Sequence, residues 1–100
     1  MSYYVDVHTH LSHSLFAKDW QKVIELAQAS GLRAIVSNGL GKASNRAVLE
    51  MAAKFTIVKA AVGIYPVEAV QNILPDDFPL NYEKFSVDTE IDFIKDLAQQ

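Results

Sequence analysis

Residues 33–39 read R-A-I-V-S-N-G, and this stretch decides the fold class. Its A-I-V run is apolar without interruption, which is typical of a strand buried on both faces in a parallel sheet. Asp19 is the expected N-cap of a helix just before it, and Gly31 is expected to end that helix in the left-handed conformation. Between them, apolar side chains recur at three- and four-residue steps: Trp20, Val23, Ile24 and Ala27.

The same alternation repeats further along the chain. Gly39, Gly41 and Ser44 are expected to form a loop and a helix cap. Residues 56–63, T-I-V-K-A-A-V-G, predict a third strand. Between this loop and this strand, a second helix is predicted from the apolar stripe of Ala47, Val48, Met51, Ala52 and Phe55.

The C-terminal third is less regular. Residues 65–86 contain all three prolines of the chain, which indicates loop with a short helical piece over 67–73. Asp88 or Thr89 is expected to cap a last helix, whose buried stripe would be Ile91, Ile94, Leu97 and Ala98. With a first strand over 5–10, strands and helices alternate, and this predicts an α/β fold with parallel strands. Residues 1–100 are interpreted as a single domain or part of one.

Composition limits the classes of function. The chain has 100 residues, of which 50% are hydrophobic and 21% charged, as in an ordinary globular protein. No apolar run approaches the ~18 residues of a membrane span, and no signal-type segment is visible, so we expect a cytoplasmic protein without membrane contact. The absence of cysteine excludes disulfides and thiolate metal sites. The net charge of −3 and the scattered basic residues do not predict a broad nucleic-acid surface.

Polar or glycine residues follow each predicted strand at its carboxyl end. These tips are His8-Thr9-His10, Ser37-Asn38-Gly39 and Gly63-Ile64-Tyr65-Pro66. In parallel α/β folds, binding and catalytic sites form at this edge of the sheet. We therefore expect the three tips to meet in one site.

The first tip carries residues that suit a metal. Successive side chains of a strand point to opposite faces, so His8 and His10 share a side, about 7 Å apart along the backbone, and Asp6 lies on that side one step deeper. Neutral imidazoles bind zinc and other divalent ions at ~2 Å. A catalytic site needs at least three protein ligands, so two histidines are too few. We expect Asp6 to orient a histidine or to structure the inner face of the strand, and not to bind the metal directly. The alternative is that H-x-H is a chance pair of ordinary polar histidines.

Other polar residues have two interpretations each. His13 is interpreted as a solvated loop histidine. Asn38 either serves its own backbone at a turn or contacts a ligand, and Tyr65 is either a core aromatic or exposed in a pocket. Lys59 either finds a carboxylate inside the sheet or extends along the helix layer.

Three segments together resemble a known family. D-V-H-T-H-L at 6–11 and A-A-V-G-I-Y-P-V-E-A at 60–69 look like the corresponding motifs of TatD-type metal-dependent hydrolases, many of which are described as deoxyribonucleases. The middle segment A-I-V-S-N-G-L, followed by S-N-R-A-V-L-E-M-A, is similar to the second strand and helix of that family. The resemblance covers essentially the whole chain.

The resemblance implies specific roles. His8 and His10 would bind the first divalent metal, which could be Zn, Mg or Mn. Tyr65 replaces a histidine that faces the substrate in the family, and a tyrosine can still donate a hydrogen bond to a phosphate oxygen. Tyr65, and Asn38 with it, are therefore the expected substrate-binding residues.

The resemblance also implies a (β/α)₈ barrel, which needs ~250 residues. We expect residues 1–100 to be its N-terminal part, about three strand–helix units, with the other metal ligands and the catalytic aspartate downstream of Gln100. The fragment is then expected to be inactive and to associate with the rest of the barrel or with itself.

The expected function of the complete protein is metal-dependent hydrolysis of a phosphodiester or nucleic-acid substrate. Two alternatives remain open. One is another amidohydrolase-like or PHP-type metal enzyme acting on a phosphomonoester or an amide. The other is a non-catalytic α/β module that packs against a partner.

Overall fold

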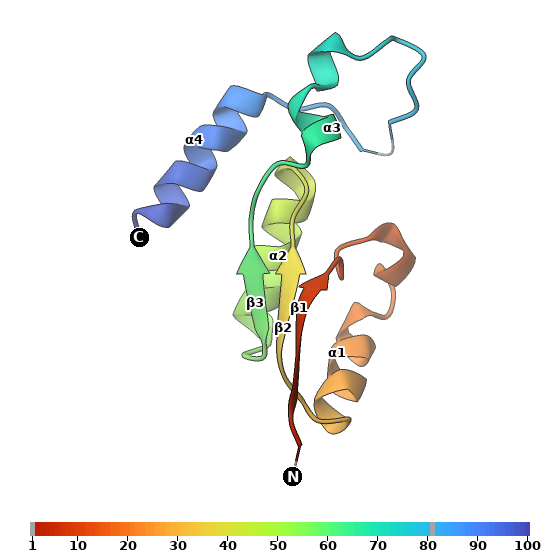
Figure 1. Ribbon diagram of the computed structural model, residues 1–100, viewed down its shortest axis with the longest axis vertical. Helices are drawn as coiled ribbons and strands as arrows, with labels where there is room; N and C mark the ends of the chain where they lie inside the picture. The colour runs from red at the N-terminus through yellow and green to blue at the C-terminus, as the bar shows by residue number, and fades with distance from the viewer. Residues whose placement is uncertain (1, 81) are drawn as a thin grey trace.

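The computed structural model describes residues 2–80 and 82–100 of the chain. Strands and helices alternate through its first two thirds, and irregular segments lead to a final helix (Figure 1). In chain order the elements are β1 (Tyr4–Thr9), a 3₁₀ turn η1 (Ser14–Phe16), α1 (Trp20–Ala29), β2 (Leu32–Asn38), α2 (Lys42–Lys54), β3 (Val58–Ala61), α3 (Pro66–Ala69), η2 (Gln71–Ile73) and α4 (Val87–Ala98).

The three strands form one parallel sheet in the order β1-β2-β3, which confirms the predicted fold class. All three arrowheads point the same way in Figure 1, so their carboxyl ends lie along one edge, near α3 and the long segment before α4. Parallel pairing requires crossovers, and α1 and α2 supply them. Gly31 has φ 104°, so it ends α1 in the left-handed region as expected.

The hydrophobic core lies between the sheet and its two crossover helices. Ile24 of α1 and Met51 of α2 pack with Ile35 of β2 and Val58 of β3 in one buried cluster. Trp20 joins this cluster from its margin, which confirms the two helical stripes that the sequence predicts. Burying each such aliphatic side chain contributes about 1.5–3 kcal/mol, so this cluster fixes both helices on the same face of the sheet.

Several element ends differ from the sequence prediction because local hydrogen bonds decide them. The third strand covers only Val58–Ala61 and not residues 56–63. Gly41 is the N-cap of α2, and the Ser44 hydroxyl accepts from the Gly41 N–H at 3.0 Å from inside the first turn. At α4 the cap is Ser86, whose Oγ accepts from the Thr89 N–H at 3.2 Å.

The prediction of a buried apolar stripe on α4 is wrong. Ile91 is 38% exposed, Ala98 is exposed, and Ile94 and Leu97 are only half-buried. The most buried side chain of the helix is Glu90, which is 2% exposed. The reason is that α4 stands to one side of the sheet in Figure 1 and is attached to α2 by polar contacts.

One face of the sheet and the β1 edge are open among the described residues. Val36 pairs with Lys59 one step beyond the buried pair of Ile35 and Val58, so Val36 and Lys59 belong to the opposite face. Lys59 is exposed there, and Val7 of β1 is 69% exposed. Separately, no helix among the described residues is long and apolar enough to cross a membrane.

We propose that β1 is covered by further strands of a barrel or by a second copy of the chain, because an exposed apolar edge strand is a template for pairing. Sedimentation of the 100-residue chain is expected to show concentration-dependent association. Val7→Lys should weaken it, since a charge on an edge strand opposes pairing.

Ile73→Lys is the matched control, because Ile73 is 81% exposed but lies outside the sheet. A chain that sediments as a monomer at every concentration contradicts this proposal.

Candidate metal and substrate site

The carboxyl ends of the three strands are tied together by hydrogen bonds. The Asn38 side-chain amide donates to the Thr9 carbonyl at 3.3 Å, which joins β2 to β1. The Gly39 N–H donates to the Ala61 carbonyl at 2.7 Å, which joins β2 to β3. The Tyr65 N–H donates to the Leu40 carbonyl, also at 2.7 Å. The three tips that the sequence singles out therefore meet at one edge of the sheet.

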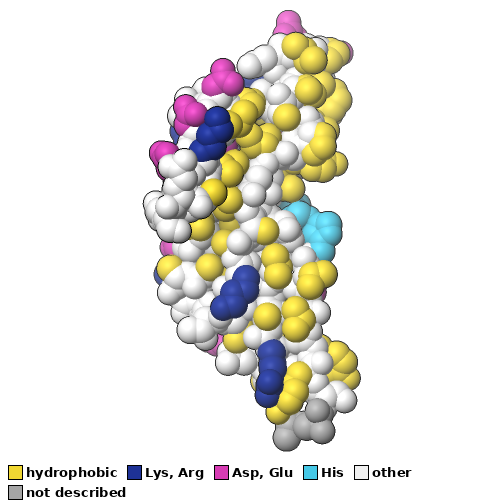
Figure 2. All heavy atoms as spheres, turned by 60° about the vertical axis from the view of Figure 1, so that its left-hand side comes forward, with side chains coloured by type: hydrophobic (Ala, Val, Ile, Leu, Met, Phe, Trp, Pro, Cys, Tyr) yellow, Lys and Arg dark blue, Asp and Glu magenta, His cyan; other side chains and the backbone are white. Residues whose placement is uncertain are grey.

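The two histidines of the first tip lie side by side. The ring centroids of His8 and His10 are 5.1 Å apart, at an interplanar angle of 72°. His8 is exposed and His10 is half-buried, so neither ring is sealed in an apolar interior. Figure 2 shows histidine side chains at the molecular surface, next to hydrophobic ones. Both rings therefore have surface that a ligand from solution is able to reach.

An irregularity in β1 accompanies this pair. Asp6 pairs with Ile35 and Thr9 pairs with Ser37, so β1 has one residue more than β2 between these two points, as in a β-bulge. The Asp6 carboxylate accepts from the His8 backbone N–H at 3.1 Å. Asp6 therefore supports the backbone of His8, and within residues 2–80 and 82–100 it makes no hydrogen bond with either ring.

The second histidine is oriented by a backbone carbonyl. The His10 Nδ1 lies 3.1 Å from the Asn38 carbonyl oxygen. Because a carbonyl can only accept, Nδ1 carries the proton in this hydrogen bond, and the neutral ring then has its lone pair on Nε2. This is the arrangement commonly found behind a metal-binding histidine. The Asn38 amide itself donates to the carbonyls of Thr9 and Val36.

These observations fit a metal site for which the described residues supply only part of the ligands. His8 and His10 supply two nitrogen donors, and among the residues that the structure describes no group of three His, Asp or Glu side chains is placed to hold a metal ion. Ligation by His8 and His10 stays a prediction, because no contact with a metal tests it.

A cleft of about 770 Å³ opens beside His10. His10 and Tyr65 line it from the strand tips, and α2 contributes Lys42. Tyr65 is 51% exposed, so it is a pocket residue and not a core aromatic. His13 also lines the cleft as an exposed loop residue, and its Nδ1 accepts from the Leu15 N–H at 3.1 Å.

A buried acid that the sequence analysis did not single out lines the same cleft. Glu68 of α3 is 7% exposed, and burial raises the pKa of its carboxyl. Its Oε1 lies against Gly41, where an added Cβ would be only 2.5 Å from that oxygen. Burial and the Glu68 charge both raise the pKa of the nearby Tyr82 hydroxyl. The cleft therefore contains, besides His10, a carboxyl group and a tyrosine hydroxyl whose pKa values are raised.

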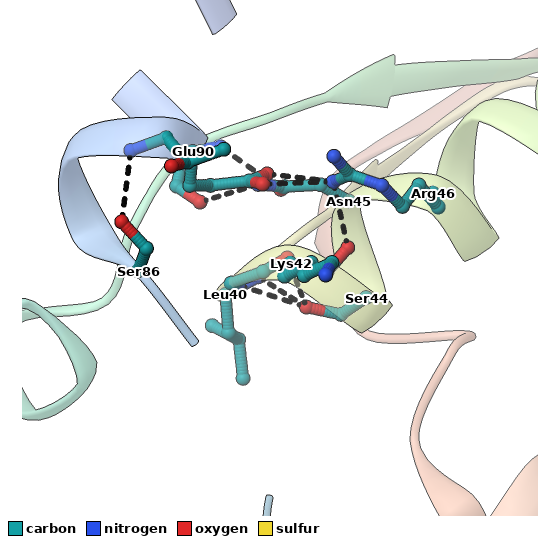
Figure 3. A network of polar contacts seen from close by, with 10 residues as sticks. Leu40, Lys42, Ser44, Asn45, Arg46, Ser86 and Glu90 are labelled. Carbon is teal, nitrogen blue, oxygen red and sulfur yellow. Dashed lines mark hydrogen bonds and ion pairs between the residues drawn. The ribbon is translucent and has the colours of Figure 1, made fainter. Parts of the chain in front are cut away.

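A network of polar contacts that the sequence analysis did not predict connects α2 to α4 and to the chain that follows β3 (Figure 3). The Asn45 side chain exchanges two hydrogen bonds with the Gly63 backbone, at 2.9 and 3.1 Å, and donates to Glu90 at 2.8 Å. Arg46 pairs with both carboxylate oxygens of Glu90 at 2.9 Å. Since Gly63 is two residues before Tyr65, this network fixes the strand end from which Tyr65 enters the cleft.

Comparisons with known proteins agree with this architecture. The family model described as TatD related DNase matches residues 5–100. A relative described as "Uncharacterized metal-dependent hydrolase YabD", from Bacillus subtilis (strain 168), is 32% identical over 65 residues. That match covers 65% of this chain but 26% of the relative, so the matched part is about a quarter of the relative's length.

The buried position of Glu68 predicts a pH effect on stability. Its pKa is raised above 4.5 in the folded state, so the folded state binds the proton more tightly than the unfolded chain. The free energy of unfolding therefore contains a contribution that is complete below pH 4.5 and is lost as the pH rises through the raised pKa. Glu68→Gln should stabilise the protein at neutral pH, with a gain that disappears in acid.

Chemical denaturation at a series of pH values measures this effect. Glu83→Gln is the control, because Glu83 lines the same cleft but is exposed. Equal free energies of unfolding for wild type and Glu68→Gln at every pH would show that burying the charged form of this carboxylate costs no stability.

Proposed function

This chain belongs to the TatD-related DNase family, and on that premise we propose that it forms part of a divalent-metal-dependent hydrolase that cleaves phosphodiesters. The observation that carries the proposal is the adjacent pair of His8 and His10, with Nδ1 of His10 held by the Asn38 carbonyl. The relative's description as a metal-dependent hydrolase supports the same class of chemistry.

His8 and His10 would hold the metal through ring nitrogens. When bound, a divalent ion such as Zn²⁺, Mg²⁺ or Mn²⁺ lowers the pKa of bound water and neutralises charge on phosphoryl oxygens. Imidazole ligands suit zinc and other transition ions. Asp6 keeps the backbone of His8 in place, and the Asn38 carbonyl sets the ring orientation of His10.

The remaining ligands and the catalytic groups would come from residues outside these 100. Two nitrogen donors are fewer than the three protein ligands that catalytic divalent sites use. We therefore propose that residues 1–100 bind metal weakly and do not hydrolyse substrate without the rest of a barrel.

The substrate would enter through the cleft beside His10. Tyr65 lines this cleft and its hydroxyl is able to donate to a phosphate oxygen. We propose Tyr65 as a substrate-binding residue, and a contact between Asn38 and substrate as a further prediction. The net charge of −3 favours a strand end or a small phosphorylated molecule over wrapped duplex DNA.

Calorimetric titration of the chain with Zn²⁺ or Mn²⁺ tests the metal part. The wild type is expected to bind one ion, and His8→Ala and His10→Ala should each weaken binding by more than about tenfold, because each removes one of two donors. His13→Ala should leave it unchanged, since this ring caps η1 through its Nδ1. Unchanged binding in His10→Ala would refute the metal site and favour the non-catalytic module.

A substrate panel tests the reaction. In a chain that continues past residue 100, a single-stranded oligonucleotide should be cleaved faster than a phosphomonoester or an amide, and a chelator should abolish cleavage. His8→Ala and His10→Ala should lower kcat/KM by more than the roughly 10- to 100-fold that is typical of groups behind metal ligands. Preference for the phosphomonoester or the amide would instead assign an amidohydrolase-like or PHP-type activity.

A further inference from the structure

The Glu68 side chain is mostly buried, and its carboxylate has no donor from the described residues. Glu68 is 7% exposed, and no hydrogen bond or ion pair to its carboxylate comes from residues 2–80 or 82–100. Among the described residues Glu90 is the other buried acid, and it receives hydrogen bonds from Asn45 and Arg46. A buried carboxylate without donors destabilises a fold. This one lines a cleft, so a ligand is able to provide the missing N–H groups.

The walls around this acid suit a flat ring. Four aromatic side chains line the cleft: Tyr65 from the strand end, and Phe78, Tyr82 and Phe85 from the segment before α4. Tyr82 and Phe85 have ring centroids 6.2 Å apart, and the Phe85 ring also lies against Gly41, next to the Glu68 Oε1. The Tyr82 hydroxyl is buried and has no hydrogen-bond partner among the described residues. The cleft thus offers aromatic faces together with two unpartnered polar groups.

The size and charge of the cleft further define the ligand. A volume of about 770 Å³ is within the range of ligand pockets and is sufficient for a nucleotide. Lys42, which begins α2, lines the cleft and supplies a positive charge for a phosphate. His10 lines it too, so a base bound there would have its phosphate near the candidate metal site.

We propose that this cleft binds one unpaired nucleobase that carries an amino group, with the Glu68 carboxylate accepting from that group and the aromatic side chains contacting the ring. The proposal rests on the phosphodiester substrate proposed above and identifies the part of the cleft that recognises its base. Adenine, cytosine and guanine have such an amino group, whereas thymine has only its N3–H, which lies between two carbonyl oxygens that repel a carboxylate. Aromatic stacking alone tolerates any base, so Glu68 provides the discrimination.

Titration of the 100-residue chain with the four deoxynucleoside monophosphates tests this, with a chelator present so that metal plays no part. Binding is followed by changes in tyrosine fluorescence or by NMR. The three amino-bearing nucleotides are expected to bind at least about fivefold more tightly than dTMP, and deoxyribose 5-phosphate should bind more weakly than all four. Phe78→Ala should weaken all four nucleotides by roughly five- to a hundredfold.

Two matched variants isolate the role of the acid. Glu68→Gln should reduce the preference over dTMP to less than about twofold, while Glu83→Gln, an exposed acid of the same cleft, should retain it. Equal binding of all four nucleotides, binding as tight without a base, no binding at millimolar concentration, or a preference that survives in Glu68→Gln would each overturn the proposal.

The result is independent of the metal experiment. Loss of base discrimination with metal binding intact at His8 and His10 would overturn only the base site. Base discrimination through Glu68 without metal binding would overturn the proposed hydrolase and leave the base site in place.

Discussion

The hydrogen bond between Nδ1 of His10 and the carbonyl of Asn38 connects the candidate chemistry to the fold. It is formed only because β1 and β2 run in parallel and end at the same edge of the sheet. An antiparallel neighbour would place its carboxyl end at the opposite edge, away from the histidines. The same bond assigns the ring proton to Nδ1 and leaves the Nε2 lone pair available. Strand direction thus determines which histidine nitrogen is able to act as a ligand.

The features that the sequence predicts correctly depend on local periodicity. A two-residue spacing in a strand places His8 and His10 near each other, and the three- and four-residue spacing in α1 places Ile24 toward the sheet. The order of strands and helices is sufficient to predict parallel pairing, because a helix crossover brings the next strand in with the same direction. None of these inferences requires knowledge of distant contacts.

The features that the sequence analysis missed depend on contacts between residues far apart in the chain. Glu90 belongs to an apparently ordinary amphipathic helix, and its burial results from Asn45 and Arg46, which are 45 and 44 residues away. Without that information, apolar periodicity favours a buried stripe that begins at Ile91. That prediction is wrong, because Ile91 is exposed. Glu68 is similar, because its neighbour Gly41 comes from another loop and leaves the space that the carboxylate fills. A sequence signal was present for Asn45, as a polar residue within an otherwise apolar helix face.

The two buried acids show how structural and ligand-binding roles differ in one fold. Burial penalises the charge on each carboxylate, and the penalty is offset only where donors surround it. Glu90 has such donors from α2, so removing Asn45 or Arg46 would leave a buried charge and loosen α4. Glu68 has no such donor among the described residues. Arg46 and Lys42 do not supply one, although both belong to α2, whose N-cap Gly41 lies next to the Glu68 Oε1. Its position therefore costs stability in the folded chain, and a ligand with N–H donors would recover that cost on binding. A carboxylate that lines a cleft beside aromatic side chains and has no donor from the described residues is consequently better explained by binding of a ligand than by a role in folding.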